Sequence, residues 1–262
     1  MKVALCQLSI MWEDKEETMK KAVSFMNEAK REKADIVFFP EMTLTGFSMQ
    51  TLKTMDRKYG ETIERFQNTC KEIGIAAGFG WVEGTEREKA KNHYSIVDDG
   101  GVLLSDYVKI HPFGYGGEGK HFQGGNKIVS CRYKEHIIST AICYDLRFPE
   151  LFRIMDENCS LVVIPANWPA SRREHWNCLL KARAIENQVY VAGVNCAGEM
   201  DGQYYSGDSV LLNPLGEELA SITGKEGMIY YDILNDVEQY RRIFPVQKDR
   251  KIEIRKLSDD NN

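Results

Sequence analysis

Residues 137–150, Ile-Ile-Ser-Thr-Ala-Ile-Cys-Tyr-Asp-Leu-Arg-Phe-Pro-Glu, place an apolar run directly before a cysteine and a potential helix start. The run predicts a buried strand, and Pro149 suits the first turn of a helix. A strand that turns sharply into a helix exposes the residue at the corner and points free backbone N–H groups at it. We expect Cys143 there, where these donors and the helix dipole favour thiolate over thiol. Taken alone, the position of Cys143 favours a buried packing residue, and packing or surface roles are expected for the other six cysteines.

The alternation of apolar strands and helices extends along the rest of the chain. Apolar or β-branched runs predict strands over 3–8, 36–39, 75–82, 94–97, 102–110, 137–143, 161–165, 189–195 and 209–212. Helical spacing of apolar residues predicts helices over 15–33, 59–73 and 173–187. Strands that are apolar throughout are buried on both faces, so the pattern predicts an α/β fold. Because no linker divides the chain, we expect one domain over residues 1–262, with a charged tail from about 247.

Composition narrows the classes of partner. The 262 residues include 34 Lys and Arg against 39 Asp and Glu, which gives a formal charge of −5. Without a basic cluster we expect no nucleic acid partner. The apolar runs are far shorter than the ~18–20 residues that span a bilayer, so we expect no membrane partner. Seven cysteines without a Cys-x-x-Cys pair, and no signal-peptide cleavage site near the start, predict reduced thiols in the cytoplasm.

Two charged residues stand at the ends of other apolar strands. Glu41 follows the strand over 36–39, and Lys109 ends the strand over 102–110. Taken alone, Glu41 fits a helix-terminal or salt-bridged carboxylate, and Lys109 a solvated strand-end charge. However, α/β folds gather their active sites at strand ends. Together with Cys143, the two residues supply the base, the cation and the nucleophile that amide hydrolysis requires.

In that scheme Glu41 takes the proton of the Cys143 thiol, and the sulfur attacks a carbonyl carbon. Lys109 and the backbone N–H of Tyr144 stabilise the resulting oxyanion. Glu41 then protonates the departing ammonia and later activates the water that hydrolyses the thioester.

Three ordered blocks resemble the catalytic blocks of the nitrilase superfamily of carbon–nitrogen hydrolases. They are Phe39-Pro40-Glu41-Met42, Lys109-Ile110-His111-Pro112-Phe113 and Cys143-Tyr144-Asp145-Leu146-Arg147-Phe148-Pro149-Glu150. The similarity covers about residues 1–245. It implies a four-layer α-β-β-α sandwich, a homodimer or larger homo-oligomer, and a reaction that uses no cofactor and no metal.

Within the superfamily the chain is most similar to the omega-amidases. These enzymes hydrolyse the terminal amide of 2-oxo dicarboxylate monoamides such as 2-oxoglutaramate, so the resemblance implies a small-molecule amide substrate. Nitriles, N-carbamoyl compounds and amides of damaged metabolites are alternative substrates within the superfamily. The resemblance also implies a second glutamate near the nucleophile. Glu118 holds the matching position, where it would orient Lys109 or the substrate amide; a solvated loop charge is the alternative.

Residues of the substrate pocket are expected after two of the strands. The guanidinium of Arg147, one turn into the following helix, is suited to a bidentate bond with a substrate carboxylate. An ion pair with Asp145 or Glu150 is the alternative. Asn167 and Trp168 are expected to form a pocket wall, and core packing is the alternative for Trp168.

One glycine-rich segment suggests a different class of protein. Residues 114–121 fit the phosphate-loop pattern G-x-x-x-x-G-K, but His121 stands where such a loop needs Ser or Thr for magnesium. The residues before the segment interrupt the strand, and those after it do not begin a helix. We therefore predict a mobile flap over the pocket with Glu118 turned inward. A phosphate-loop nucleotide-binding protein is the alternative.

Overall fold

The structure is a computed structural model that describes residues 1–57 and 60–251. Within them, one sheet runs in the order β13 (Gly227–Asp232), β1 (Lys2–Gln7), β2 (Ile36–Phe38), β3 (Ala76–Glu83), β4 (Lys91–Val97) and β5 (Leu103–Val108). The other runs in the order β10 (Ala197–Met200), β11 (Gln203–Leu212), β9 (Tyr190–Asn195), β8 (Leu161–Ala166), β7 (His136–Thr140) and β6 (Ser130–Tyr133). Strand β12 (Glu218–Thr223) pairs with β11 on that second sheet.

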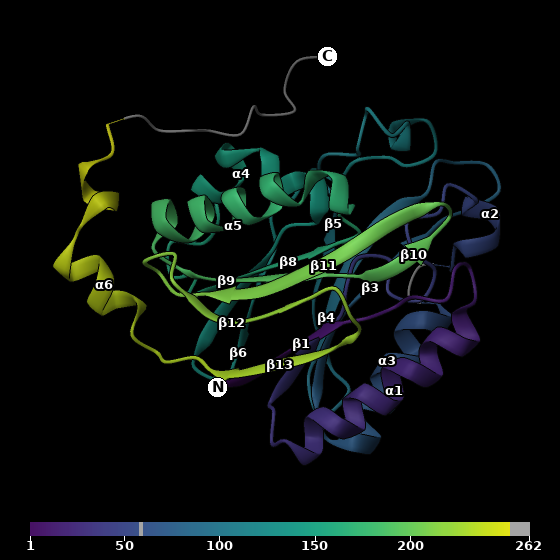
Figure 1. Cartoon of the computed structure of the whole chain (residues 1–262), viewed down its shortest axis with the longest axis horizontal. Helices are drawn as coiled ribbons and strands as arrows, with labels where there is room; N and C mark the ends of the chain where they lie inside the picture. Colours follow the sequence, from purple (N-terminus) through teal and green to yellow (C-terminus); the bar gives the residue numbers. More distant parts are fainter. Residues whose placement is uncertain (58–59, 252–262) are drawn as a thin grey trace.

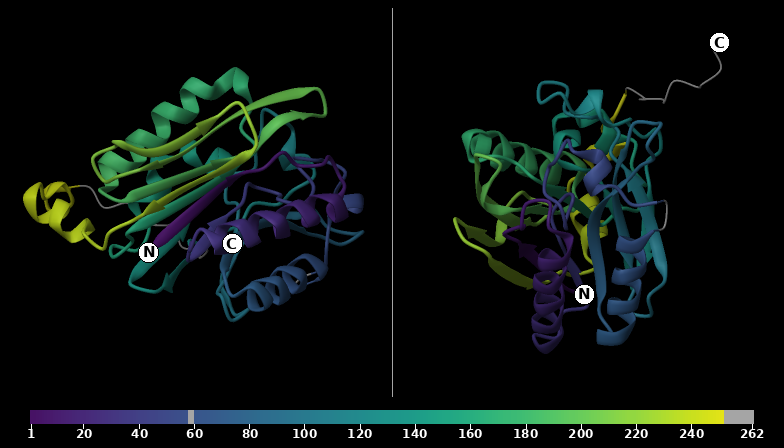
Figure 2. Two further views of the ribbon diagram at one scale, coloured as in Figure 1. Left: turned by 60° about the horizontal axis from the view of Figure 1, so that its bottom comes forward. Right: turned by 90° about the vertical axis from the view of Figure 1, so that its right-hand side faces the viewer.

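The two sheets lie face to face, and helices cover their outer sides (Figures 1 and 2). Helices α1 (Lys15–Arg31) and α3 (Glu61–Ile73) cover the first sheet, and α4 (Pro149–Arg153) and α5 (Arg173–Asn187) cover the second. This arrangement confirms the four-layer α-β-β-α sandwich. Shorter helices connect or flank these layers. They are α2 (Thr51–Thr54), α6 (Val237–Ile243) and the 3-10 turns η1 (Glu118–Lys120), η2 (Cys143–Arg147), η3 (Ala170–Arg172) and η4 (Val246–Asp249).

The buried strands explain the apolar runs of the sequence. In β1, Val3 and Leu5 point into the core between the sheets, whereas Ala4 and Cys6 point into the core beneath α1 and α3. Both faces of the strand are therefore covered, so apolar residues occur at successive positions instead of alternating with polar ones. No helix of the described residues is long and apolar enough to cross a membrane.

Strand directions bring several loops to one edge of each sheet. Strands β2 and β3 are parallel, and β5 runs in the same direction because β4 is antiparallel to both β3 and β5. Glu41 after β2 and Lys109 after β5 therefore leave the first sheet at the same edge. In the second sheet β7 and β8 are parallel, so Cys143 and Asn167 also leave at a common edge.

Some boundaries differ from the expected ones. Strand β7 ends at Thr140, so Cys143 lies in the turn η2 and not in the strand. Arg147 also belongs to η2, one segment before the helix in which it was expected. The expected helix over 59–73 begins at Glu61, and Tyr59 lies outside the described residues, as do residues 252–262 of the charged tail. The sequence pattern missed four strands and the first part of β11. The missed strands are β6, β10, β12 and β13.

Candidate active site

Cys143 lies at a strained corner that other side chains hold in place. It has a φ of 47°, in the left-handed region that non-glycine residues rarely adopt. The buried Asp145 accepts hydrogen bonds from the backbone N–H groups of Ile142 (3.0 Å) and His111 (2.9 Å). It also contacts the Tyr107 hydroxyl at 2.8 Å and His111 Nδ1 at 2.7 Å. Asp145 thus joins the cysteine turn to the segment that follows Lys109.

Glu41 lies in a turn that packs against the backbone of β3. The next residue, Met42, has a φ of 45°, and the N–H of Thr43 donates to the carbonyl oxygen of Gly80 at 3.0 Å. A Cβ on Gly80 would lie 2.3 Å from the backbone nitrogen of Met42. Glycine at this position therefore allows the turn to approach the sheet.

Lys109 bridges two carboxylates inside the protein. Its Nζ lies 2.9 Å from Glu41 Oε1 and 2.9 Å from Glu118 Oε2. The side chains of Glu41 and Glu118 are fully buried, and that of Lys109 is 1% exposed. Glu118 is therefore not a solvated loop charge, and its carboxylate also accepts a hydrogen bond from the N–H of Phe113.

This cluster controls the ionisation of the neighbouring side chains. Burial alone would lower the pKa of Lys109, but the carboxylates of Glu118 and Glu41 raise it well above its usual value. Burial also raises the pKa of the Cys143 thiol, and the charge of Glu41 raises it further, while Lys109 lowers it only in part. Two carboxylates and one ammonium already leave a net negative charge in this buried space, and a thiolate would add a second.

The raised pKa of Cys143 corrects the expectation that the corner favours the thiolate. Burial and the carboxylates of Glu41 and Glu118 outweigh the ammonium of Lys109, a neighbouring charge that favours the thiolate. The resting side chain is a neutral thiol. For such a thiol to act as a nucleophile, a neighbouring base has to accept its proton.

Two asparagines hold the carboxylates. Asn92, the second residue of β4, donates from Nδ2 to Glu41 Oε1 at 2.7 Å and to Glu118 Oε1 at 3.4 Å. Asn167 donates from its backbone N–H to Glu41 Oε2 at 2.9 Å, which joins the edges of the two sheets. The sequence did not predict a role for Asn92, because no motif around it along the chain indicates a functional site.

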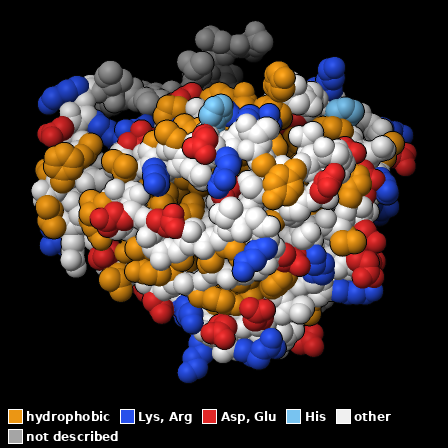
Figure 3. Space-filling view, viewed as in Figure 1, with side chains coloured by type: hydrophobic (Ala, Val, Ile, Leu, Met, Phe, Trp, Pro, Cys, Tyr) orange, Lys and Arg blue, Asp and Glu red, His pale blue; other side chains and the backbone are white. Residues whose placement is uncertain are grey.

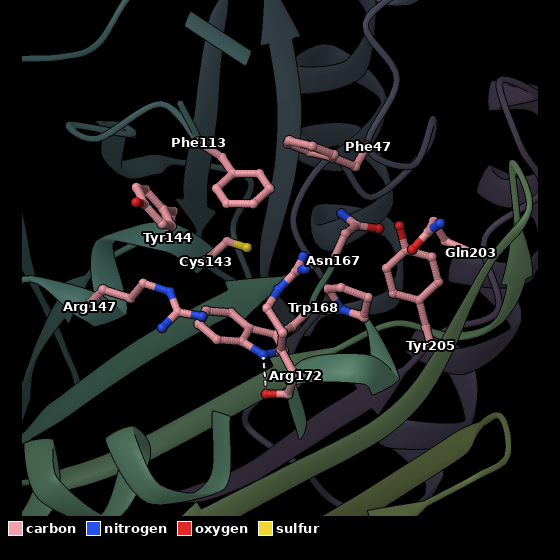
Figure 4. Close-up of a pocket in the computed structure, with 11 residues that line it drawn as sticks. Phe47, Phe113, Cys143, Tyr144, Arg147, Asn167, Trp168, Arg172, Gln203 and Tyr205 are labelled. Carbon is pink, nitrogen blue, oxygen red and sulfur yellow. Dashed lines mark hydrogen bonds between the residues drawn. The ribbon is translucent and has the colours of Figure 1, made fainter. Parts of the chain in front are cut away.

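The thiol of Cys143 opens into a cavity of about 170 Å³ (Figure 4). Its walls come from loops that follow strands of both sheets and from β11 of the second sheet. The lining residues are Phe47, Phe113, Cys143, Tyr144, Arg147, Asn167, Trp168, Pro169, Arg172, Gln203 and Tyr205. The four expected pocket residues, Tyr144, Arg147, Asn167 and Trp168, all lie in this wall.

Tyr144 contributes a free backbone donor beside the sulfur. No described residue accepts a hydrogen bond from its backbone N–H. Its ring packs against Phe113 and Phe148, with centroid distances of 4.9 and 5.3 Å. These contacts fix the orientation of the turn that carries Cys143.

Arg147 does not form the ion pair considered as its alternative. Within the described residues no carboxylate lies within 4.0 Å of its guanidinium. The guanidinium instead lies over the Trp168 ring, 4.7 Å from the centroid, and Nη2 contacts His175 Nδ1 at 3.2 Å. Trp168 is buried, yet it lines the cavity as well as packing against Trp176. Arg147 therefore presents an unpaired positive charge to the cavity.

The glycine-rich segment is built around Glu118. The N–H of Glu118 donates to the carbonyl oxygen of Phe113, and the Glu118 side chain returns to the N–H of the same residue. The segment contains only the short turn η1, and the next element after it is the strand β6, so residues 114–121 do not form a loop that leads into a long helix as a phosphate site requires. The inward position of Glu118 agrees with the expected flap, whose mobility remains a prediction.

The described residues contain no group of three His, Cys, Asp or Glu side chains that could hold a metal ion. Of the other six cysteines, Cys178 is exposed and the rest are buried.

The sequence of this chain is similar to a family of known proteins and to individual members of it. The sequence model of the family described as "Carbon-nitrogen hydrolase" matches residues 2–242. The protein named omega-amidase YafV of Yersinia enterocolitica is 32% identical over 252 residues, which are 95% of this chain and 96% of that protein. The protein named 2-oxoglutaramate amidase of Bacillus subtilis is 30% identical over 250 residues, 94% of this chain and 96% of that protein.

The fold is also similar to solved structures. XC1258 from Xanthomonas campestris, described as a CN-hydrolase superfamily protein with an arsenic adduct in the active site, superposes with a TM-score of 0.91. It is 27% identical, and the superposition covers 98% of this chain and 99% of that chain.

Proposed function

Because this chain belongs to the carbon–nitrogen hydrolase family, and so is a hydrolase that acts on amides, we propose that it removes the terminal amide of a small carboxylate-bearing substrate. The substrate class is an omega-amide like 2-oxoglutaramate, and the products are the acid and ammonia. One observation carries the proposal. The Cys143 thiol lies beside the buried Glu41–Lys109–Glu118 cluster and opens into a cavity that presents the unpaired guanidinium of Arg147.

Acylation begins with proton transfer. Glu41 takes the proton of the Cys143 thiol while the sulfur attacks the amide carbon, so the second negative charge never rests on sulfur. The carbonyl oxygen becomes an oxyanion between Lys109 Nζ and the backbone N–H of Tyr144. Loss of one such donor typically costs about 2.7–4 kcal/mol in the transition state.

The tetrahedral intermediate then collapses. Glu41 returns the proton to the amide nitrogen and the carbon–nitrogen bond breaks. Ammonia departs, and the acyl group remains bound to Cys143 as a thioester. Water enters from the cavity, Glu41 takes its proton, and the hydroxide oxygen attacks the thioester carbon. When the carbon–sulfur bond breaks, the proton on Glu41 returns to sulfur and restores the neutral thiol.

Glu118 supports this cycle as a positioning residue. Its carboxylate contacts Lys109 Nζ with both oxygens, at 3.1 and 2.9 Å. It therefore keeps the ammonium protonated and oriented when Glu41 becomes neutral during proton transfer. With Glu41 protonated, the pair Lys109 and Glu118 remains balanced in charge.

Arg147 supports a substrate that carries a carboxylate. A guanidinium binds a carboxylate through two parallel hydrogen bonds, and in this site no protein carboxylate within the described residues competes for it. The cation–π contact with the Trp168 ring holds the guanidinium at the cavity wall.

Product analysis tests the proposal. A panel that contains 2-oxoglutaramate, glutaramate, butyramide and an N-carbamoyl amino acid is assayed for ammonia, and intact mass is measured for the acyl adduct on the protein. Ammonia together with a 2-oxo diacid supports the omega-amidase. Carbon dioxide with ammonia from the N-carbamoyl compound supports another hydrolase of the same family and overturns the proposed substrate.

The nucleophile is tested with matched cysteine variants. We expect Cys143→Ala to abolish ammonia release and adduct formation, with unchanged far-ultraviolet circular dichroism. Cys178→Ala, which changes an exposed cysteine, should retain full activity. Equal loss in both variants contradicts the assignment of Cys143.

We also propose that the chain works as a cytoplasmic homodimer or larger homo-oligomer. Large apolar side chains near α6 support an interface, since Ile243 is 83% and Phe244 is 69% exposed. Figure 3 shows apolar side chains gathered over that end of the molecule. Light scattering of the full chain and of Ile243→Asp measures the assembly, and a wild-type monomer at micromolar concentration argues against it. The free cysteines support a reducing compartment.

A further inference from the structure

A second arginine, Arg172, reaches the same cavity from a different part of the chain. It is the last residue of η3, which connects β8 to α5. Its guanidinium lies 5.4 Å from the centroid of the Phe113 ring, which belongs to the loop after β5. Figure 4 shows the side chain rising past Trp168 toward the centre of the pocket, between Arg147 and Tyr205.

No acidic side chain in residues 1–57 and 60–251 neutralises this second charge. Within the described residues no carboxylate lies within 4.0 Å of the Arg172 guanidinium, and none of the residues that line the cavity is acidic. The positive charge of Arg172 also contributes to lowering the pKa of Arg147, after burial, so the two guanidiniums share one electrostatic environment. Two cations that face one small cavity without partners leave room for two separate oxygen functions of a ligand.

We propose that Arg172 recognises the group on the carbon next to the substrate carboxylate and selects a 2-oxo acid over the corresponding amino acid. This inference rests on the proposed function, in which Arg147 binds the carboxylate. The oxygen of a 2-oxo group accepts a hydrogen bond from Arg172. An α-ammonium group at the same position would meet a second cation and find no carboxylate in the pocket wall.

Three amides of equal length separate these contributions. 2-Oxoglutaramate, glutaramate and glutamine share a five-carbon chain, a terminal amide and a carboxylate, and they differ only at the second carbon. For the wild-type protein we expect kcat/KM to fall in that order. For Arg172→Gln we expect kcat/KM for 2-oxoglutaramate to fall by about 10- to 100-fold, as the loss of one charge-assisted hydrogen bond predicts. In the same variant kcat/KM for glutaramate should change by less than about threefold, because glutaramate lacks the 2-oxo oxygen and so loses no such bond.

Two control variants define the reference. Arg147→Gln should lower kcat/KM for 2-oxoglutaramate and glutaramate alike, because both carry the carboxylate. Arg173→Gln removes the same charge at the next residue, which pairs with Asp208 at 2.6 Å and does not line the cavity. It should leave the ratio of 2-oxoglutaramate to glutaramate unchanged. Thermal unfolding of each variant verifies that the fold persists.

A binding measurement keeps the inference testable even if the proposed reaction fails. Calorimetry with 2-oxoglutarate, glutarate and glutamate measures the same discrimination without turnover. We expect Arg172→Gln to raise the Kd of 2-oxoglutarate by about 10-fold or more and to change the Kd of glutarate by less than about threefold. Equal losses for both acids, or no loss for either, overturn the role of Arg172. Absence of ammonia from every five-carbon amide, with this binding pattern intact, overturns the proposed reaction and not the recognition by Arg172.

Discussion

Asn167 binds Glu41 at two points, from its backbone N–H to Oε2 at 2.9 Å and from Nδ2 to the backbone carbonyl oxygen at 2.7 Å. The two residues are far apart in the sequence and belong to loops of different sheets. The carboxylate of the proposed base, in a loop of the first sheet, is therefore held by a loop of the second sheet, the sheet that carries Cys143. The distance between the proposed base and the nucleophile depends on this contact.

Loss of the Asn167 side chain should disturb the base without removing it. In Asn167→Ala the carbonyl oxygen of Glu41 loses its buried donor, which typically costs about 1–3 kcal/mol. We expect kcat/KM for the best amide to fall by at least about tenfold, with a lower free energy of unfolding from urea titration. Asn126→Ala, at an exposed asparagine, should leave both quantities unchanged. Wild-type activity of Asn167→Ala would argue that the two sheets need no such link.

A methyl group on Gly80 should displace the turn that carries Glu41. The added Cβ would lie 2.3 Å from the Met42 nitrogen and 2.9 Å from the Glu41 carbonyl carbon, both of which are backbone atoms that cannot rotate away. We expect Gly80→Ala to lower kcat by at least about 100-fold, the scale of a misplaced general base. Gly114→Ala, where nothing lies within 4 Å of the added Cβ, is the control. The prediction is wrong if both variants retain wild-type kcat.

Asp145 should be essential for the shape of the cysteine turn. Asp145→Ala removes an acceptor for the backbone N–H groups of Ile142 and His111 and for the Tyr107 hydroxyl, all in a buried environment. Each buried donor left without an acceptor typically costs about 1–3 kcal/mol. We expect a comparable loss in the free energy of unfolding and no acyl adduct on Cys143. Glu150→Ala, at an exposed carboxylate on α4, should show neither effect.

Stability should fall in alkaline solution. Burial raises the pKa of Cys159 from 9.0 to about 11 and that of Cys70 from 9.0 to about 12. Above pH 9 the unfolded chain releases these protons while the folded chain keeps them, so the free energy of the unfolded state falls relative to that of the folded state. The stabilisation is complete below about pH 9 and is lost progressively as the pH rises toward the folded pKa values. Each group contributes up to about 1.4 kcal/mol per pH unit in that window.

Urea unfolding at pH 8 and pH 10 measures this loss. We expect a lower free energy of unfolding at pH 10, and a smaller difference between the two pH values in Cys159→Ala. The exposed Cys178→Ala should behave like the wild type. A free energy of unfolding that does not change over this range contradicts the predicted coupling.

The sequence by itself determined the elements whose residues are buried on both faces and the loops that follow them. The helix expected over 173–187 is α5 with the same bounds. The strands expected over 3–8, 36–39 and 161–165 are β1, β2 and β8, and their observed bounds differ by no more than one residue at each end. Burial on both faces demands consecutive apolar residues, and such runs are visible locally. Strands β12 and β13 are partly exposed, so burial does not demand long apolar runs there, and the sequence pattern did not predict them.

Only the tertiary structure decided how the ends of those strands interact. The contact of Asn92 with both carboxylates, the unpaired state of Arg147 and Arg172, and the neutral thiol of Cys143 all depend on which charges share a buried space. Such electrostatic effects act between groups that are neighbours in space, and their size depends on burial. The order of residues along the chain gives neither the distance between two such groups nor their burial, because both are set when the two sheets pack together.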